Sequence, residues 1–309
     1  MNISGINSLV FYRTEHKRIL LLGEVHSLEG ECAPKTKNSV RVATYLKRLL
    51  KIPVGECLDI FLEGSYKIPI ISRHSNLAKN ISKLSFVKLN NLRIHHTDPR
   101  VIISEGRKYS PFAVMIILLL ESKNYEDVLS EEDLIKTLDY LLTINRKENR
   151  KYFLKLIRAF STDPKVMRLF RFWEASYFKI ITKELKKLDK TTMTRKKLLT
   201  NLSEVYHENI REGTYQTKNK LVDLMLTLIA LPIDLYNLSR MFIKFNKKRD
   251  STCNKLTVDN IIIYTGSIHT QIYEKFFNRV FNTTPLIKSV NQSHADLCLP
   301  VPKFNFWEK

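Results

Sequence analysis

The sequence is poor in the residues that shape turn-rich and disulfide-rich proteins. Its 309 residues include 8 glycines and 10 prolines, and this scarcity argues against an all-β protein with many tight turns. The four cysteines are Cys32, Cys57, Cys253 and Cys298. They form no C-x-x-C pair, are too few for a disulfide scaffold, and are too irregularly spaced for a zinc knuckle. We therefore expect reduced thiols in a reducing compartment.

Long apolar runs are also scarce. Residues 112–120 are too few to cross a bilayer, and residues 221–235 are interrupted by two aspartates and a proline. Neither reaches the roughly 20 apolar residues that a membrane span needs. Residues 1–10 lack a basic segment followed by a sustained apolar run, so they do not resemble a signal peptide. We expect core helices, no transmembrane segment and a cytoplasmic location.

Acidic residues are few beside the basic ones. The chain has 31 Asp and Glu against 51 Lys and Arg, a net charge of +20. Nucleic acid, an anionic membrane surface and an acidic substrate are the partners that such a charge favours. An AT-rich genome gives the same lysine-rich composition with no partner at all. The basic run 183–197 lacks the interleaved aromatic residues of single-strand binders, so we interpret it as solvated surface and keep nucleic acid as the minority interpretation.

Short apolar segments at both ends of the chain predict a parallel sheet. Residues 17–22 and 57–62 have the length and abrupt polar ends of buried strands, and residues 40–50 between them have helical spacing. This strand–helix–strand order is a βαβ unit, which implies parallel strands. Residues 87–94, 259–264 and 286–290 add further predicted strands, and residues 269–280 a helix.

The middle of the chain has almost no strand signal. Apolar spacing and capping residues predict helices over residues 112–122, 131–142, 148–159, 165–188, 195–209 and 219–245. The fold class is therefore α/β, with a mostly parallel central sheet flanked by helices and a large all-helical insertion. We place the N-terminal half of the core at 1–110, the helical insertion or cap at 111–246, and the C-terminal part of the core at 247–309.

Ionisable residues follow three of the predicted strands. Glu24 and His26 follow the first, Glu63 the second, and His269 the late strand. Ligands of open parallel sheets bind beyond the carboxyl ends of the strands, so these four side chains converge if the strands are neighbours. Such a set suits acid–base hydrolysis, or a divalent metal site with an open position for water. The pattern leaves both open, so the cofactor is either a divalent metal ion held by these four residues or none. For each histidine alone, a helix-capping role is the alternative.

The segment 95–100, His-His-Thr-Asp-Pro-Arg, is the densest polar cluster of the sequence. His96, Asp98 and Arg100 are candidates for binding an anionic substrate, because loop residues often carry function. The alternative is an exposed turn, which the Asp98–Pro99 pair favours.

A second polar cluster lies at the end of the predicted helical region. Asp234, Asn237 and Arg240 recur at spacings of three, so they share one helical face. This face either lines a polar cavity, with Asp234 and Tyr236 binding substrate, or is simply solvated. Arg240 is a candidate for stabilising the oxyanion of an ester hydrolysis.

Three short motifs resemble a known superfamily. LLLGEVH at 20–26, IFLEG at 60–64 and IYTGSIH at 263–269 resemble the erythromycin-esterase/ChaN-like branch of the Tiki/TraB superfamily. The resemblance implies a parallel-sheet α/β core with helical additions and a site made of Glu24, His26, Glu63 and His269. It makes His26 the general base that activates water, and Arg240 matches an arginine upstream of the second histidine motif. RIHHTDPR and DLYNLSRMF also resemble uncharacterised homologues of large DNA viruses.

The sequence therefore predicts a hydrolase-like protein that cleaves an ester or a peptide. Its substrate would be a small molecule or a peptide, with an anionic group for Arg100 to bind. The alternative is a non-catalytic, basic virion- or nucleic-acid-associated protein that retains the fold. If the source is viral, the location is the host cytoplasm or the virion.

Overall fold

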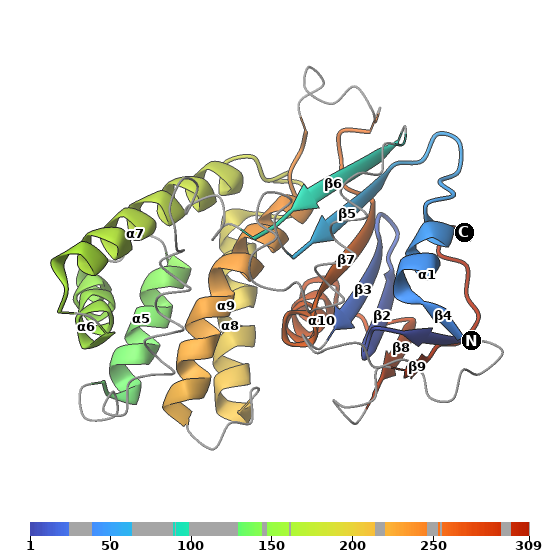
Figure 1. Ribbon diagram of the computed structural model, residues 1–309. Coiled ribbons are helices and arrows are strands. Elements are labelled where there is room, and N and C mark those ends of the chain that lie inside the picture. Colours follow the sequence, from blue (N-terminus) through green and yellow to red (C-terminus); the bar gives the residue numbers. More distant parts are fainter. Residues whose placement is uncertain are drawn as a thin grey trace. The chain divides into compact units, whose positions relative to one another are not determined.

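The chain forms two compact units. The structure, a computed structural model, describes residues 1–24, 39–63, 89, 91–98, 129–143, 147–160, 162–213, 220–245, 253, 255–291 and 298–308. One unit comprises Met1–Thr97 with Met241–Lys309, and the other comprises Asp98–Arg240 (Figure 1). The sequence places the helical segment at 111–246. The predicted α/β fold is confirmed.

Six strands form the main sheet of the first unit within the described residues. Their spatial order is β6 (Leu92–His96), β5 (Leu58–Leu62), β7 (Asn260–Gly266), β3 (Arg18–Glu24), β2 (Ser8–Arg13) and β8 (Ile287–Val290). The first four run parallel to one another, and β2 pairs antiparallel with both of its neighbours. The sheet is therefore mostly parallel, as the βαβ reading of the sequence predicts.

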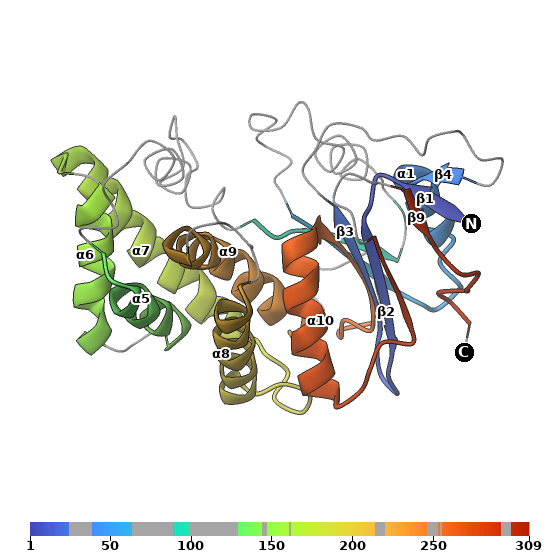
Figure 2. The ribbon, with the colours of Figure 1, turned by 90° about the horizontal axis from the view of Figure 1, so that it is seen from below.

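Helices and a smaller sheet cover the two faces of the main sheet. On one face lie α1 (Val42–Leu49) and a sheet of β4 (Ser39–Arg41), β1 (Asn2–Ser4) and β9 (Cys298–Pro300). On the other lies α10 (Ser267–Phe281) (Figure 2). Because both faces are covered, the central strands are buried on both sides and read as continuous apolar runs in the sequence.

The strands of the smaller sheet escaped the sequence analysis, as did β2. β1, β4 and β9 have three residues each, which is too short for an alternating pattern to stand out. The C-terminal segment continues this pairing: Val301 donates its backbone N–H to the Met1 carbonyl at 2.8 Å, just beyond the pairing of β9 with β1.

A disulfide joins two distant parts of the first unit. Cys57 and Cys253 are bonded across a sequence separation of 196 residues, with their Cα atoms 6.0 Å apart, a normal Cα separation for a disulfide. Cys298 is disulfide-bonded as well. The expectation of reduced thiols is wrong for these three cysteines, because the sequence does not reveal that residues so far apart meet at the base of β5.

The second unit is helical throughout its described part. It contains α5 (Glu131–Thr143), the 3₁₀ turn η2 (Lys147–Asn149), α6 (Arg150–Phe160), α7 (Pro164–Leu185), α8 (Arg195–Glu212) and α9 (Lys220–Met241), whose last residue belongs to the first unit. These helices match the predicted ones closely; the helix predicted over 112–122 lies outside the described residues. Helix α7 begins at Asp163, whose carboxylate accepts a hydrogen bond from the Lys165 backbone N–H at 2.7 Å. Helix α8 begins at Thr194, whose hydroxyl accepts one from the Lys197 backbone N–H at 3.1 Å. Both helices therefore have a side-chain N-cap.

Helix α9 is the most apolar helix of the second unit. Among the described residues it is the one helix long and apolar enough to cross a membrane, yet 78% of its apolar stretch is buried inside the protein. Asp234, Asn237 and Ser239 are also fully buried there. This is the packing of a core helix, as the sequence predicts.

Candidate active site

Four strand ends meet at one edge of the main sheet. Strands β6, β5, β7 and β3 are parallel neighbours, so their carboxyl ends lie side by side. Glu24 is paired with Gly266 in the register of β3 with β7, and Leu62 with Tyr264 in that of β5 with β7. This alignment confirms that the strands carrying Glu24, Glu63 and His269 are neighbours, which is the condition for a shared site.

Glu63 and His269 form an ion pair just beyond the strands. The Oε1 atom of Glu63 lies 3.3 Å from the Nε2 atom of His269, and each side chain is only 9% exposed. Glu63 follows β5 directly, whereas His269 lies in the first turn of α10, immediately after β7. A carboxylate so close to an imidazole in a nearly dry environment stabilises the protonated ring.

The second oxygen of Glu63 is fixed by the start of α10. Its Oε2 atom accepts from the Thr265 hydroxyl and from the Gly266 backbone N–H, both at 2.7 Å. Gly266 is the N-cap of α10, so the carboxylate sits at the positive end of the helix dipole. Glu63 also donates its own backbone N–H to the Tyr264 carbonyl at 3.1 Å. The backbone and the side chain of Glu63 are therefore both hydrogen-bonded to β7.

Glu24 has a different partner, which the sequence analysis missed. Its side chain is buried, and its Oε2 atom accepts a short hydrogen bond from the Tyr264 hydroxyl. Tyr264 lies opposite Leu22, so it is the diagonal neighbour of Glu24 on the same face of the sheet. The signal was present in the sequence: the alternation of residues along both motifs puts these two side chains on one face.

The two glutamates hydrogen-bond on opposite sides of β7. Glu24 binds Tyr264 and Glu63 binds Thr265, and successive residues of a strand point to opposite faces. His26 lies outside the described residues, so the convergence of all four side chains on one cavity stays a prediction. Among the described residues, no group of three His, Cys, Asp or Glu side chains is arranged to hold a metal ion. A metal site therefore depends on His26 as well.

Gly23 of the first motif has a packing role. A Cβ at this position would lie 2.1 Å from the Ser8 hydroxyl, 2.9 Å from the Thr270 hydroxyl and 3.1 Å from the Ser267 Cα. Ser267 and Thr270 flank His269 in the first turn of α10. The absence of a side chain at Gly23 thus lets the helix that carries His269 lie directly on β3.

Another buried carboxylate, Asp59, is the second residue of β5. Asp59 is fully buried and accepts two hydrogen bonds of 2.7 Å from the Arg93 guanidinium, and its Oδ1 atom lies 2.8 Å from the Nε2 atom of His95. Burial pushes the pKa of Asp59 upward, but the hydrogen bonds from His95 and Arg93 outweigh burial and hold the pKa below its usual value.

Aromatic rings and backbone carbonyls enclose this cluster. His95 is stacked between Phe61 and Phe245, with ring centroids 4.5 and 5.7 Å away. Arg93 also donates to the carbonyls of Lys255 and Thr257 at 2.8 and 2.9 Å. Since every group faces another protein group, we interpret Asp59, Arg93 and His95 as a structural network.

The cluster at 95–100 therefore divides into parts with different environments. His95 belongs to the buried network, and His96 ends β6 on the opposite face, where it is partly exposed. Asp98 is buried and begins the helical unit. Arg100 lies outside the described residues. The predicted substrate-binding role of His96, Asp98 and Arg100 stays a prediction.

The polar face of α9 is buried, so the solvated-face alternative is wrong for Asp234 and Asn237. Asp234 accepts a short hydrogen bond from the Tyr206 hydroxyl. Arg240 lies 3.2 Å from the Glu184 carboxylate and stacks over the Tyr236 ring at 5.6 Å. These contacts all lie within the helical unit, and binding of substrate by Asp234, Tyr236 or Arg240 stays a prediction.

Comparisons of the chain with protein-family models, with curated proteins and with solved structures found no match. The resemblance of its three motifs to the erythromycin-esterase/ChaN-like branch therefore stays a prediction. Any assignment of function has to come from the arrangement of the strand ends.

Proposed function

We propose that the protein is a hydrolase that cleaves an ester or a peptide bond at the carboxyl ends of β3, β5 and β7. The observation that carries this proposal is the Glu63–His269 ion pair, 3.3 Å long, at the sheet edge where parallel sheets bind ligands. The resemblance of the motifs to the erythromycin-esterase/ChaN-like branch points in the same direction.

In this proposal, His269 and His26 share the proton transfers. Glu63 faces the Nε2 atom of His269, and we assign to His269 the exchange of a proton with water or with the leaving group. Glu63 stabilises the imidazolium that forms, and its bonds to Thr265 and Gly266 fix it in place. His26 activates the attacking water, as the resemblance implies.

A divalent metal ion is the other form of this proposal. His26, His269 and Glu63 offer imidazole and carboxylate ligands that zinc accepts, and a bound ion would polarise the substrate carbonyl. Glu24 hydrogen-bonds on the opposite face of β7 from Glu63, which argues against Glu24 as a fourth ligand. The paired orientation of Glu63 and His269 supports hydrolysis with or without such an ion. Metal analysis of the purified protein, before and after chelation, separates the two forms of the mechanism.

The test is a panel of chromogenic esters and peptides, assayed with and without added zinc. His26→Ala and His269→Ala should each lower the hydrolysis rate by roughly a hundredfold or more, the usual share of an acid–base group. His16→Ala is the matched control, because His16 lies on the surface with 74% of its side chain exposed. Circular dichroism verifies that each variant is folded. Unchanged hydrolysis in both His26→Ala and His269→Ala would refute the proposal.

The cytoplasmic location is also a proposal. Reduced cysteines were one ground for it, but Cys57 and Cys253 are bonded, and disulfides persist mainly in oxidising compartments. Titration of free thiols in protein extracted under alkylating conditions tests the location. Cytoplasmic protein would have reactive thiols at these positions.

A further inference from the structure

The exposed side of α7 carries a straight row of cations. Lys165, Arg168, Lys179, Lys183 and Lys186, the C-cap residue, recur at helical spacing with Phe172 and Ala175 between them, and every one of these side chains is exposed. At 100° per residue these seven positions fall within one narrow stripe. We call this row the α7 stripe.

The acidic residues of α7 do not neutralise the stripe. Glu174 and Glu184 are both buried, 3% and 5% exposed. Glu174 accepts from the Tyr140 hydroxyl and lies 3.2 Å from Arg150, whereas Glu184 binds Lys187 and Arg240. Their charges are thus matched inside the helical unit. Within the described part of the chain, no carboxylate lies within ion-pair distance of the stripe cations.

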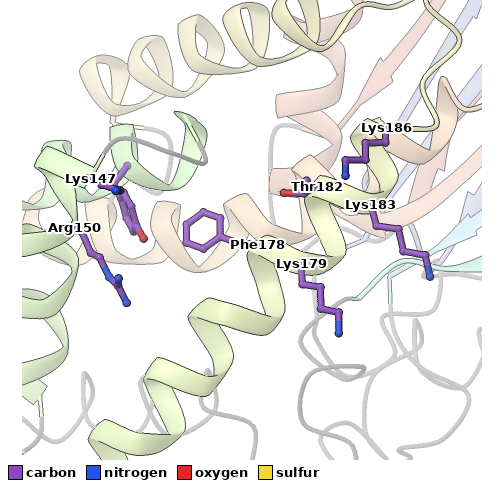
Figure 3. A pocket seen from close by; sticks show the side chains of 8 residues that line it. Lys147, Arg150, Phe178, Lys179, Thr182, Lys183 and Lys186 are labelled. Atoms are coloured by element: carbon purple, nitrogen blue, oxygen red, sulfur yellow. The ribbon is translucent and has the colours of Figure 1, made fainter.

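A hollow of about 630 Å³ continues the stripe onto the neighbouring elements. Its walls include Lys179 and Lys183 of α7 and the C-cap residue Lys186. Lys147 of η2 and Arg150, the first residue of α6, line it as well. Figure 3 shows Lys179 and Lys183 projecting from the same side of α7, and Phe178 pointing toward Lys147 and Arg150. Five cations therefore surround one open space in the helical unit.

We propose that the α7 stripe, together with this hollow, binds single-stranded nucleic acid. The stripe runs for about 30 Å at 1.5 Å per residue. Its cations form one group of two, Lys165 and Arg168, and one group of three, Lys179, Lys183 and Lys186, separated by about 16 Å of helix that carries Phe172 and Ala175. A chain of phosphates matches a long, linear row of positive charge better than a compact phosphate ligand does.

Phe172 favours a single strand over other polyanions. Its ring is 45% exposed in the middle of the stripe, where an unpaired base can stack on it between two phosphate contacts. A duplex keeps its bases stacked internally and offers no such partner. A membrane would need an apolar face to insert, but Phe170, Trp173, Tyr177 and Ile181 of α7 are all buried in the core.

The test is fluorescence anisotropy of the full chain with a labelled oligothymidylate of about 16 nucleotides, within the range of known single-strand sites. The triple variant Lys179→Ala, Lys183→Ala, Lys186→Ala should bind roughly tenfold or more weakly. The slope of log affinity against log salt should fall by about 2, because each phosphate contact contributes about 0.7 for single strands.

The matched control removes the same charge elsewhere. Lys47, Arg48 and Lys51 are exposed basic residues in and just after α1, and replacing all three by Ala should leave the affinity within about twofold if location decides binding. Equal losses in both triple variants would overturn the proposal, because net charge alone would then explain binding.

The aromatic residue provides an independent readout. Phe172→Leu should weaken binding by about fivefold or more, whereas Phe172→Tyr should retain it, because stacking needs a ring. Duplex DNA of the same length, vesicles containing phosphatidylserine and polyglutamate serve as competitors. If any of these competes as well as the single strand does, or if the oligonucleotide does not bind, the proposal is wrong.

Discussion

Two carboxylates at the two ends of strand β5 each face a histidine, yet their surroundings differ. Asp59 is the second residue of the strand and is fully buried, with Arg93 and His95 around it. Glu63 follows the last residue of the same strand and lies beside His269, with 9% of its side chain exposed. A carboxylate–imidazole pair is thus buried within the sheet in one case and lies at the edge of the sheet in the other.

The contrast shows that position along a strand decides what a carboxylate–imidazole pair can do. The Asp59 pair packs against the rings of Phe61 and Phe245 and receives a bidentate arginine, so its described partners are structural groups of the protein. The Glu63 pair lies where a helix begins and where parallel strands bind ligands. We therefore assign stability to the first pair and propose chemistry for the second.

The largest loss of stability should come from replacing Asp59, which pairs with Arg93 and His95. Asp59→Asn leaves the Arg93 charge buried without its counter-ion, which should lower the free energy of unfolding by about 3–5 kcal/mol. Urea denaturation measures it. Glu63→Gln should cost clearly less, because the amide keeps an acceptor for the Gly266 N–H and the side chain reaches solvent. Equal losses in the two variants would abolish the distinction.

Loss of the disulfide should be the next largest effect. The double variant Cys57→Ser, Cys253→Ser should be about 2–4 kcal/mol less stable, because the bond closes a loop of nearly 200 residues in the unfolded chain. The comparison is by urea denaturation of the oxidised wild type and the variant. The bond lies at the start of β5, away from the Glu63 end, so hydrolysis per folded molecule should be retained. Unchanged stability would mean that the bond does not form in solution.

A single methyl group at Gly23 should affect the candidate site through packing. Gly23→Ala places a Cβ against Ser267 and Thr270 of α10, so the first turn of that helix has to move, at a cost of about 1–3 kcal/mol. Because His269 lies in the same turn, the hydrolysis rate should fall even in the folded fraction. A stable variant with full activity would show that α10 is not held as tightly as described. Gly55→Ala is the control for a glycine with open space around it, although its φ of +81° adds local strain.

The smallest effect is the acid dependence of stability. The pKa of Asp59 is lowered in the folded protein, so the unfolded state binds its proton more readily, and stability rises with pH across the interval between the two pKa values. The contribution of Asp59 is therefore complete above the usual aspartate pKa of about 3.9 and is lost as the pH falls through the folded value. Asp59→Asn should flatten the acid limb of a stability–pH curve. If the acid limb of the curve is the same in Asp59→Asn and wild type, the pKa of Asp59 is not lowered in the folded protein.

The sequence predicts the sheet well where strands are long and buried. The apolar runs at 17–22, 57–62 and 259–264 are β3, β5 and β7, and their shared polar ends led to Glu24, Glu63 and His269. The pairing of parallel strands follows from the βαβ order. The burial of Asp234 and Asn237 within α9 could not be foreseen, because helical spacing alone does not tell a polar cavity wall from a solvated face.

Other features depend on contacts between distant residues. The Cys57–Cys253 bond spans 196 residues, and no local pattern marks it. His95 stands beside the candidate residues of the polar cluster at 95–100, and only its bond with Asp59, 36 residues earlier, gives it a structural role. The basic run 183–197 contains no aromatic residue. Phe172 lies on the same α7 stripe as Lys183 and Lys186, but three helical turns earlier in the sequence, so the run alone does not reveal it.

The most direct test of the central claim compares the two histidines. The hydrolysis rate per folded molecule should be measured for His269→Asn and His95→Asn on whichever ester or peptide of the panel the wild type cleaves fastest. We predict a loss of about a hundredfold to ten-thousandfold for His269→Asn, and a rate close to wild type for His95→Asn, with lowered stability. Equal rates in the two variants would contradict the assignment of chemistry to the Glu63–His269 pair.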